Sequence, residues 1–144
     1  MRRATLYGTV VAVLTTAVNL LHGVAHEGEH MILLGWQWAY VIVVVFFAPV
    51  LAAGLLWTRY RRPGTWVLVA SMVGSFFGLA YHFSIPGPDN VFALQPRVWR
   101  APFQVSAALL LLLRGIGSLV GAWVLSSMRS PLAGTWRASG TEPR

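Results

Sequence analysis

Four long apolar stretches alternate with short polar segments along the chain. They run from about residue 5 to 26, 37 to 57, 65 to 85 and 103 to 126. A helix that crosses a bilayer needs about 20 mostly apolar residues, and each stretch reaches that length. The segments between them are short or rich in Pro and Gly, which end helices. The pattern therefore predicts an all-α protein, an integral membrane four-helix bundle with short loops.

Composition supports the membrane interpretation. Hydrophobic residues make up 56% of the 144-residue chain and charged residues only 10%. A soluble globular domain carries about 25% charged residues, so this chain has too little polar surface to cover a water-soluble particle. The chain has no cysteine, which excludes disulfides, thiolate ligands and a cysteine nucleophile. We expect one domain over residues 1–127 and a disordered, polar cytoplasmic tail over residues 128–144.

The basic residues are arginines, and apart from Arg114 they lie in the polar segments that flank the apolar stretches. A net charge of +7 would suit nucleic acid, but this placement instead indicates anchoring against anionic lipid. Arginine is enriched on the cytoplasmic side of membrane proteins, so the richer side sets the orientation. One side carries Arg97 and Arg100, and the other carries Arg2, Arg3, Arg59, Arg61, Arg62, Arg129, Arg137 and Arg144. Both termini are therefore predicted to be cytoplasmic. The use of arginine without lysine is typical of proteins from GC-rich bacteria, so we expect the membrane to be a bacterial inner membrane.

The first stretch has an alternative interpretation as a cleaved signal peptide. Two arginines, an apolar core and the small residues Gly23-Val24-Ala25 resemble such a leader and its cleavage site. The apolar core of a leader usually has about 7–15 residues, and this one is longer, which favours a membrane span. Cleavage would leave three spans, with His26 at the new N-terminus.

Three of the four histidines recur at every fourth position where the first apolar stretch ends. Helical positions four apart advance by about 40° around the axis, so His22, His26 and His30 share one face if the helix continues. Asn19 and Glu29 fall on the same face and extend it into a polar stripe. Because polar groups that face hydrocarbon are costly, the stripe is predicted to face the interior of the bundle.

The fourth histidine, His82, is predicted to meet this polar face. The third stretch runs in the same direction as the first, and at about 1.5 Å per residue His22 and His82 both lie roughly 25 Å along their helices. Ser71, Ser75 and Gly78 lie on the His82 face and would let the third helix approach the first closely. The two histidines are therefore predicted to be neighbours at the outer side of the membrane.

Imidazole suits zinc, copper, iron and nickel, and two histidines four apart on a helix can hold one ion. The predicted metal ligands are His22, His26, His30, His82 and Glu29. Glu27, Glu29 and Asp89 are close enough in sequence to complete the shell or orient the ligands, and Asn19 and Arg114 are further supporting candidates. Haem b is the alternative cofactor, with His22 and His82 as its axial ligands. The inner half of the polar stripe offers only Thr15 and Asn19 as a path for ions, which favours an accessory, sensing or redox role over a pump. No catalytic residue is assigned.

Arg114 lies near the middle of the fourth stretch, where an arginine costs about 2.5–3.5 kcal/mol on insertion scales. Gly117, Ser118 and Gly121 lie on or near its face, which predicts that it points into the bundle. Three interpretations stay open. The guanidinium caps carbonyls freed near Pro49, binds an anion such as a haem propionate or a lipid headgroup, or extends along a groove of small residues to water.

A non-enzymatic interaction subunit is the alternative function. In that interpretation the polar stripe and Arg114 pack against a partner membrane protein or a second copy of the chain. The same residues would also serve as an unliganded network that packs the helices, or as a substrate or proton site without metal. The sequence has no phosphate-binding glycine loop and no nucleophile motif, so it assigns no enzyme class.

Overall fold

The computed structural model describes residues 2–31, 33, 35–86, 90–94 and 98–128. Within these residues the chain is helical and has no β-strand, which confirms the predicted all-α class. The elements are α1 (Arg2–Gly28), α2 (Gly35–Tyr40), the π-helix η1 (Val41–Phe47), α3 (Ala48–Leu56), α4 (Arg61–Ser84) and α5 (Arg100–Ser127). Of the predicted tail only Met128 is described, and Asp89 and Arg97 lie outside the described residues.

Four helical spans are long and apolar enough to cross a membrane, as the sequence predicts. They are Arg3–Gly28, Gly35–Leu56, Arg61–Ser84 and Arg100–Ser127. Most of their ends lie beyond the predicted ones, because helical hydrogen bonding continues into polar residues such as Arg61 and Arg100 that an apolar pattern leaves out. Many large apolar side chains point outward and are exposed, including Leu6, Val13 and Leu119. Such a surface is compatible with contact to lipid.

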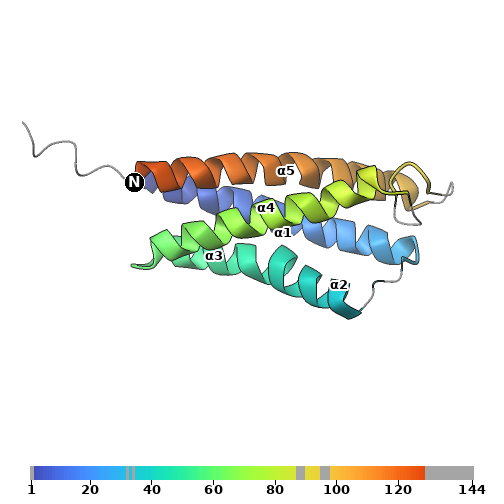
Figure 1. The fold of residues 1–144 in the computed structure, drawn as a ribbon, viewed down its shortest axis with the longest axis horizontal. Helices are drawn as coiled ribbons and strands as arrows, with labels where there is room; N and C mark the ends of the chain where they lie inside the picture. Colours follow the sequence, from blue (N-terminus) through green and yellow to red (C-terminus); the bar gives the residue numbers. More distant parts are fainter. Residues whose placement is uncertain (1, 32, 34, 87–89, 95–97, 129–144) are drawn as a thin grey trace, which may run out of the picture.

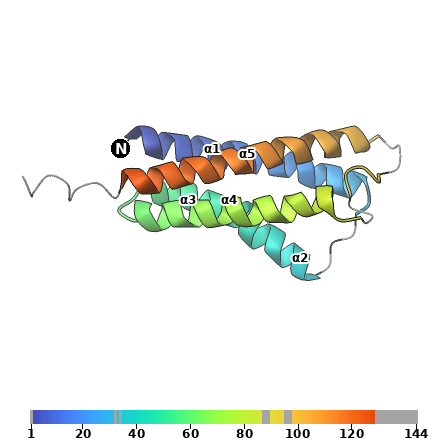
Figure 2. The ribbon, with the colours of Figure 1, turned by 45° about the horizontal axis from the view of Figure 1, so that its top comes forward.

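The spans form a bundle in which α1 and α4 lie on a diagonal (Figures 1 and 2). Both α5 and α3 pack along α1 and along α4, whereas α1 and α4 contact each other little. Gly117 and Gly121 of α5 allow this packing. A Cβ atom added at Gly117 would lie 2.9 Å from Val11 Cγ1 and from Met72 Sδ, and one at Gly121 would lie 2.5 Å from Val69 Cγ2. The absence of a side chain at both positions therefore lets α5 approach α1 and α4 closely.

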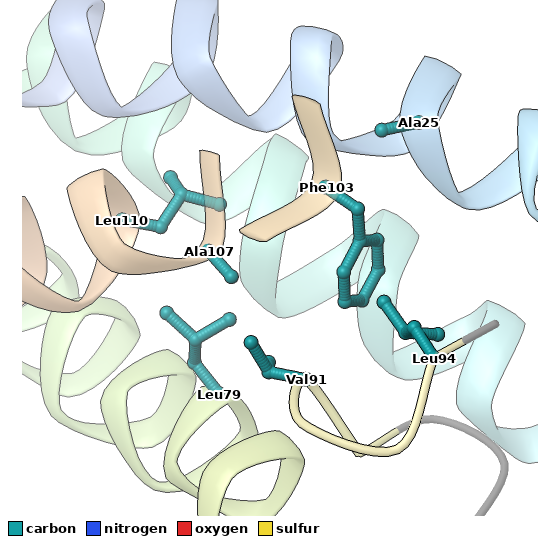
Figure 3. Packing of buried hydrophobic residues seen from close by; sticks show 7 residues of the cluster. All are labelled: Ala25, Leu79, Val91, Leu94, Phe103, Ala107 and Leu110. Atoms are coloured by element: carbon teal, nitrogen blue, oxygen red, sulfur yellow. The ribbon is translucent and has the colours of Figure 1, made fainter. Parts of the chain in front are cut away.

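Two apolar clusters fill the bundle and leave a polar layer between them. The cluster near the chain termini consists of Val11, Ala12, Ala52, Leu56, Leu68 and Met72. The cluster at the opposite end consists of Ala25, Leu79, Val91, Leu94, Phe103, Ala107 and Leu110 (Figure 3). Asn19, Ser75 and Arg114 form a polar layer in the middle of α1, α4 and α5, and all three are buried.

The second span is interrupted by η1, a feature that the hydropathy pattern does not reveal. Pro49 follows in the first turn of α3, and because proline has no N–H it cannot donate to the carbonyl four residues earlier, that of Val45. Short π-helical turns inside α-helices often occur at functional sites. The helix α2, which runs directly into η1, diverges from the other helices (Figures 1 and 2). Among the described elements, the backbone of α2 lies close only to that of η1, its own continuation.

Candidate metal centre

Three of the predicted ligands converge at the end of the bundle that lies away from the chain termini. His22 and His26 come from successive turns of α1, and His82 comes from the last turn of α4. One ring nitrogen of each lies within 4.8 Å of one nitrogen of each of the others. The ring centroids of His22 and His82 are 6.2 Å apart, and those of His26 and His82 are 5.5 Å apart. The prediction that His22 and His82 are neighbours is confirmed.

The small residues of α4 do not bring the two helices together in the predicted way. Gly78 faces Tyr40 of α2, since a Cβ atom at Gly78 would lie 3.1 Å from the Tyr40 hydroxyl oxygen. That hydroxyl donates a hydrogen bond of 2.7 Å to the carbonyl oxygen of Gly74. The glycines therefore accommodate a tyrosine that ties the diverging α2 to α4. His82 and His22 instead meet across the diagonal of the bundle, through their side chains.

Phe103, in the first turn of α5, supports all three imidazole rings. Its ring centroid lies 4.7 Å from that of His22, 5.0 Å from that of His26 and 6.0 Å from that of His82. The side chain is fully buried, and it extends from α5 into the cluster with Ala25 and Leu94 (Figure 3). A rigid aromatic ring in contact with each imidazole restricts the directions in which the three rings can turn.

Ser106 is hydrogen-bonded to His22. Its hydroxyl oxygen lies 2.9 Å from His22 Nδ1 and 3.0 Å from the carbonyl oxygen of Phe103. A serine hydroxyl has one proton, so when it donates to Phe103 it accepts from Nδ1–H of His22. The lone pair of the neutral imidazole is then on Nε2, as metal coordination requires. Nε2 is buried and has no hydrogen-bond partner among the residues that the structure describes.

A hydrogen-bonded chain crosses the polar layer below the histidines. Arg114 Nη2 donates to Asn19 Oδ1 at 2.7 Å, and Asn19 Nδ2 donates to the carbonyl oxygen of Val45 at 3.1 Å. Arg114 Nη1 donates to the carbonyl oxygen of Ser75 at 2.8 Å. The predicted inward orientation of Arg114 is confirmed, and extension of its side chain to water is wrong. The carbonyl freed by Pro49 is capped by Asn19, while Arg114 caps a carbonyl of α4.

A cavity of about 660 Å³ connects the histidines with Arg114. It lies between α1, α4 and the diverging segment of α2 and η1, and Arg114 of α5 also lines it. Its polar lining includes His22, His26, His82, Asn19, Ser75, Tyr40, Gln37, Glu27 and Arg114. Most of the remaining wall is apolar, with Leu20, Val41, Val45, Phe46, Phe77 and Leu79. Ligand sites in proteins commonly have volumes of about 300–1,000 Å³ and this mixture of walls.

The remaining predicted ligands do not join the three histidines. His30 has a φ of 56° and is exposed, because α1 ends at Gly28 and the next turn closes on itself. The amides of His30 and Met31 donate to the carbonyls of Glu27 and His26, which places His30 at the left-handed position of a helix C-terminus. The helical spacing of four is therefore lost before His30. Gly23 and Gly28 lie in this segment, and glycine weakens a helix.

The carboxylates take different positions. Glu29 is buried, and its Oε1 has no hydrogen-bond partner among the described residues, but it is not part of the group of convergent ligands. Glu27 is exposed and lines the mouth of the cavity. Asp89 lies outside the described residues. Ser106, Phe103 and Tyr40 were not predicted as site residues, although Ser106, Leu110 and Arg114 recur at a helical spacing of four.

Comparison of the chain with protein-family models, with curated proteins and with solved structures gives no match. The chemistry of the site is that of three imidazoles with convergent nitrogens, one of them hydrogen-bonded to a serine, beside a cavity that a buried arginine also lines.

Proposed function

We propose that the protein is a multi-pass protein of the cell membrane that binds one transition metal ion through His22, His26 and His82. The observation that carries this proposal is His22 Nε2, a buried acceptor that Ser106 aligns and that has no partner among the described residues. Buried polar atoms are nearly always satisfied, so an acceptor without a protein partner beside two further imidazole nitrogens is suited to a metal ligand role.

The spacing of the imidazoles suits a single ion after a small adjustment. Metal–nitrogen bonds of about 2.0–2.1 Å place tetrahedral ligand atoms about 3.4 Å apart. The three nitrogens lie within 4.8 Å of one another, so each has to move toward the centre by about 1 Å or less. Rotation of the half-buried His26 and His82 rings provides such movement, while Phe103 keeps them facing the centre.

The ligand set favours borderline divalent ions. Three neutral imidazoles without thiolate suit Zn²⁺, Cu²⁺, Ni²⁺ or Fe²⁺. Structural zinc sites use four protein ligands, whereas sites with three leave one position for water or another ligand. All three histidines line the cavity, so a fourth ligand reaches the ion from there. A sensing, accessory or redox role needs such an exchangeable position.

An ion fits this site better than haem does. A porphyrin held by His22 and His82 as axial ligands needs free space around the axis that joins them. His26 offers a nitrogen within 4.8 Å of both ligand atoms, so its ring fills part of that space. The alternative of an interaction subunit also loses support, because Asn19 and Arg114 are buried inside the single chain and are not presented to a partner.

The orientation proposed is that of both termini in the cytoplasm, with the histidines on the outer side. Arg59, Arg61 and Arg62 line one depression together with Thr5 and Met128. The basic turn between α3 and α4 therefore lies beside the start of α1 and the end of α5. Such a concentration of arginine is typical of the cytoplasmic side. A periplasm-active reporter fused after the last residue should be inactive, and an active one would reverse the orientation.

Metal content tests the proposal. The chain is purified without a His tag, stripped with chelator, and offered Zn²⁺, Cu²⁺, Ni²⁺, Co²⁺ or Fe²⁺ before elemental analysis and an absorption spectrum. One ion per chain is expected in the wild type, with loss in His22→Ala and in His82→Ala. His30→Ala is the matched control and should bind normally. A Soret band would show that the cofactor is haem and not a metal ion. Equal metal binding by the wild type and all three variants would refute the site.

A further inference from the structure

We propose that the inner end of the cavity binds the acidic group of an anionic amphiphile, with Arg114 as its counter-charge. Arg114 lies near the middle of α5, lines the cavity and is 4% exposed. Its Nε is buried and has no hydrogen-bond partner among the described residues. A guanidinium has five N–H donors, and the two bonds to Asn19 and Ser75 use two of them.

The charge of Arg114 is not neutralised by the groups that hold it. Both acceptors, Asn19 Oδ1 and the carbonyl oxygen of Ser75, are uncharged. Glu27 is the only carboxylate among the described residues that line the cavity, and it is exposed at the end of α1. A buried charge without a counter-charge is costly. An anion that enters the cavity beside Arg114 would supply the missing counter-charge and offset that cost.

The shape and walls of the cavity define the rest of the ligand. Beyond the polar inner end the wall is mainly apolar, with Val41, Phe46 and Phe77 among its residues. An acidic head on an apolar body matches this arrangement, since each part meets a wall of its own kind. Carboxylate and phosphate both suit a guanidinium, which pairs with two oxygens at once. A free fatty acid and an anionic membrane lipid share this chemistry.

The anion site stands on Arg114 and does not require a metal. The two sites are nevertheless adjacent, because Asn19 precedes His22 by three residues, a rise of about 4.5 Å along α1. An ion held by the histidines adds positive charge to the same cavity. Metal should therefore strengthen binding of the anion, and the anion should strengthen binding of the metal by the same factor.

The test measures binding of decanoate, with decanol as the uncharged probe of equal chain length, to the full chain in neutral detergent after chelator treatment. Equilibrium dialysis should give one decanoate per wild-type chain, with decanol weaker by about tenfold or more, as loss of a hydrogen bond to a charged group implies. Arg114→Gln should bind decanoate more weakly than the wild type by the same factor. Arg100→Gln is the matched control, because Arg100 lies on the same helix and outside the cavity lining, and it should bind as the wild type does.

Two results would overturn the anion site. One is equal binding of decanoate and decanol by the wild type, a comparison that holds even if Arg114→Gln fails to fold. The other is unchanged decanoate binding by a folded Arg114→Gln. Native mass spectrometry of protein taken from membranes separates the sources, since a fatty acid and a phospholipid give different adduct masses. Decanoate binding is measured on metal-free protein, so a negative result does not affect the metal proposal. In the same way, failure to load metal does not affect the anion site.

Discussion

Asn19 Nδ2 donates a hydrogen bond of 3.1 Å to the carbonyl oxygen of Val45. Pro49, four residues further on, cannot supply the α-helical donor for that carbonyl. The side chain of one span therefore replaces a backbone donor that is missing from another. The same amide accepts from Arg114 at 2.7 Å, so one asparagine joins α1, η1 and α5 in the middle of the bundle.

Asn19→Ala should destabilise the protein by about 2–3 kcal/mol, because it leaves a buried carbonyl and a buried guanidinium donor unpaired. Unfolding in mixed detergent gives the free energy. Thr16→Ala is the control, since Thr16 bonds only to the carbonyl of Ala12 in its own helix. Pro49→Ala restores a backbone donor near Val45 and should recover part of the loss in the Asn19→Ala background. No recovery would mean that the carbonyl does not contribute to the cost.

Arg114→Leu should lower the free energy of unfolding by roughly 2–4 kcal/mol, because Asn19 Oδ1 and the carbonyl oxygen of Ser75 lose buried donors. A double-mutant cycle with Asn19→Ala should give a coupling energy of about 1 kcal/mol or more, as expected for groups in direct contact. Thermal melts of the four proteins provide the comparison. A neutral or more stable Arg114→Leu would show that burial of the charge costs more than its hydrogen bonds contribute.

Ser106→Ala should weaken metal binding by about 10–100-fold while leaving the three ligands in place, because partners of metal-bound histidines fix their orientation. Competition with a chromogenic chelator measures the affinity. Ser118→Ala is the matched control, because Ser118 lies on the same helix and its hydroxyl donates to the carbonyl oxygen of Arg114. If Ser106→Ala binds metal as tightly as Ser118→Ala does, the serine does not select the coordinating tautomer of His22.

His22→Cys combined with His82→Cys should be joined by a short thiol-reactive crosslinker, since the native ring centroids are 6.2 Å apart. The intramolecular product moves faster on a denaturing gel. His30→Cys with His82→Cys serves as the control and should react less, because His30 is exposed and outside the convergent group. Equal yields from both pairs would indicate that the ends of α1 and α4 are not held in this arrangement.

Hydropathy was sufficient to predict the four spans, because apolar length alone decides which helices can cross a membrane. The rise per residue was sufficient to place His22 and His82 at the same depth, since both helices run the same way from the same end. His30 was misplaced, because the end of α1 depends on a left-handed residue that periodicity does not reveal. The Asn19–Val45 bond was also missed.

The contacts between helices could not be predicted from the sequence either. Which faces meet depends on the diagonal placement of α1 and α4, and the pattern along one helix does not determine its neighbours. The pairing of Ser106 with His22 follows from α5 packing on α1. The contact of Gly78 with Tyr40 follows from the divergence of α2. Neither element order nor spacing contains that information.

X-ray absorption at the metal edge of the loaded protein, purified without a His tag, tests the metal centre most directly. We expect three imidazole nitrogens at about 2.0–2.1 Å with one further light ligand, and two imidazoles in His82→Ala if that variant retains metal. Binding should weaken as the pH falls, because protons compete with the metal for the imidazole nitrogens. A spectrum without imidazole scattering, or one that is unchanged in both His22→Ala and His82→Ala, would contradict it.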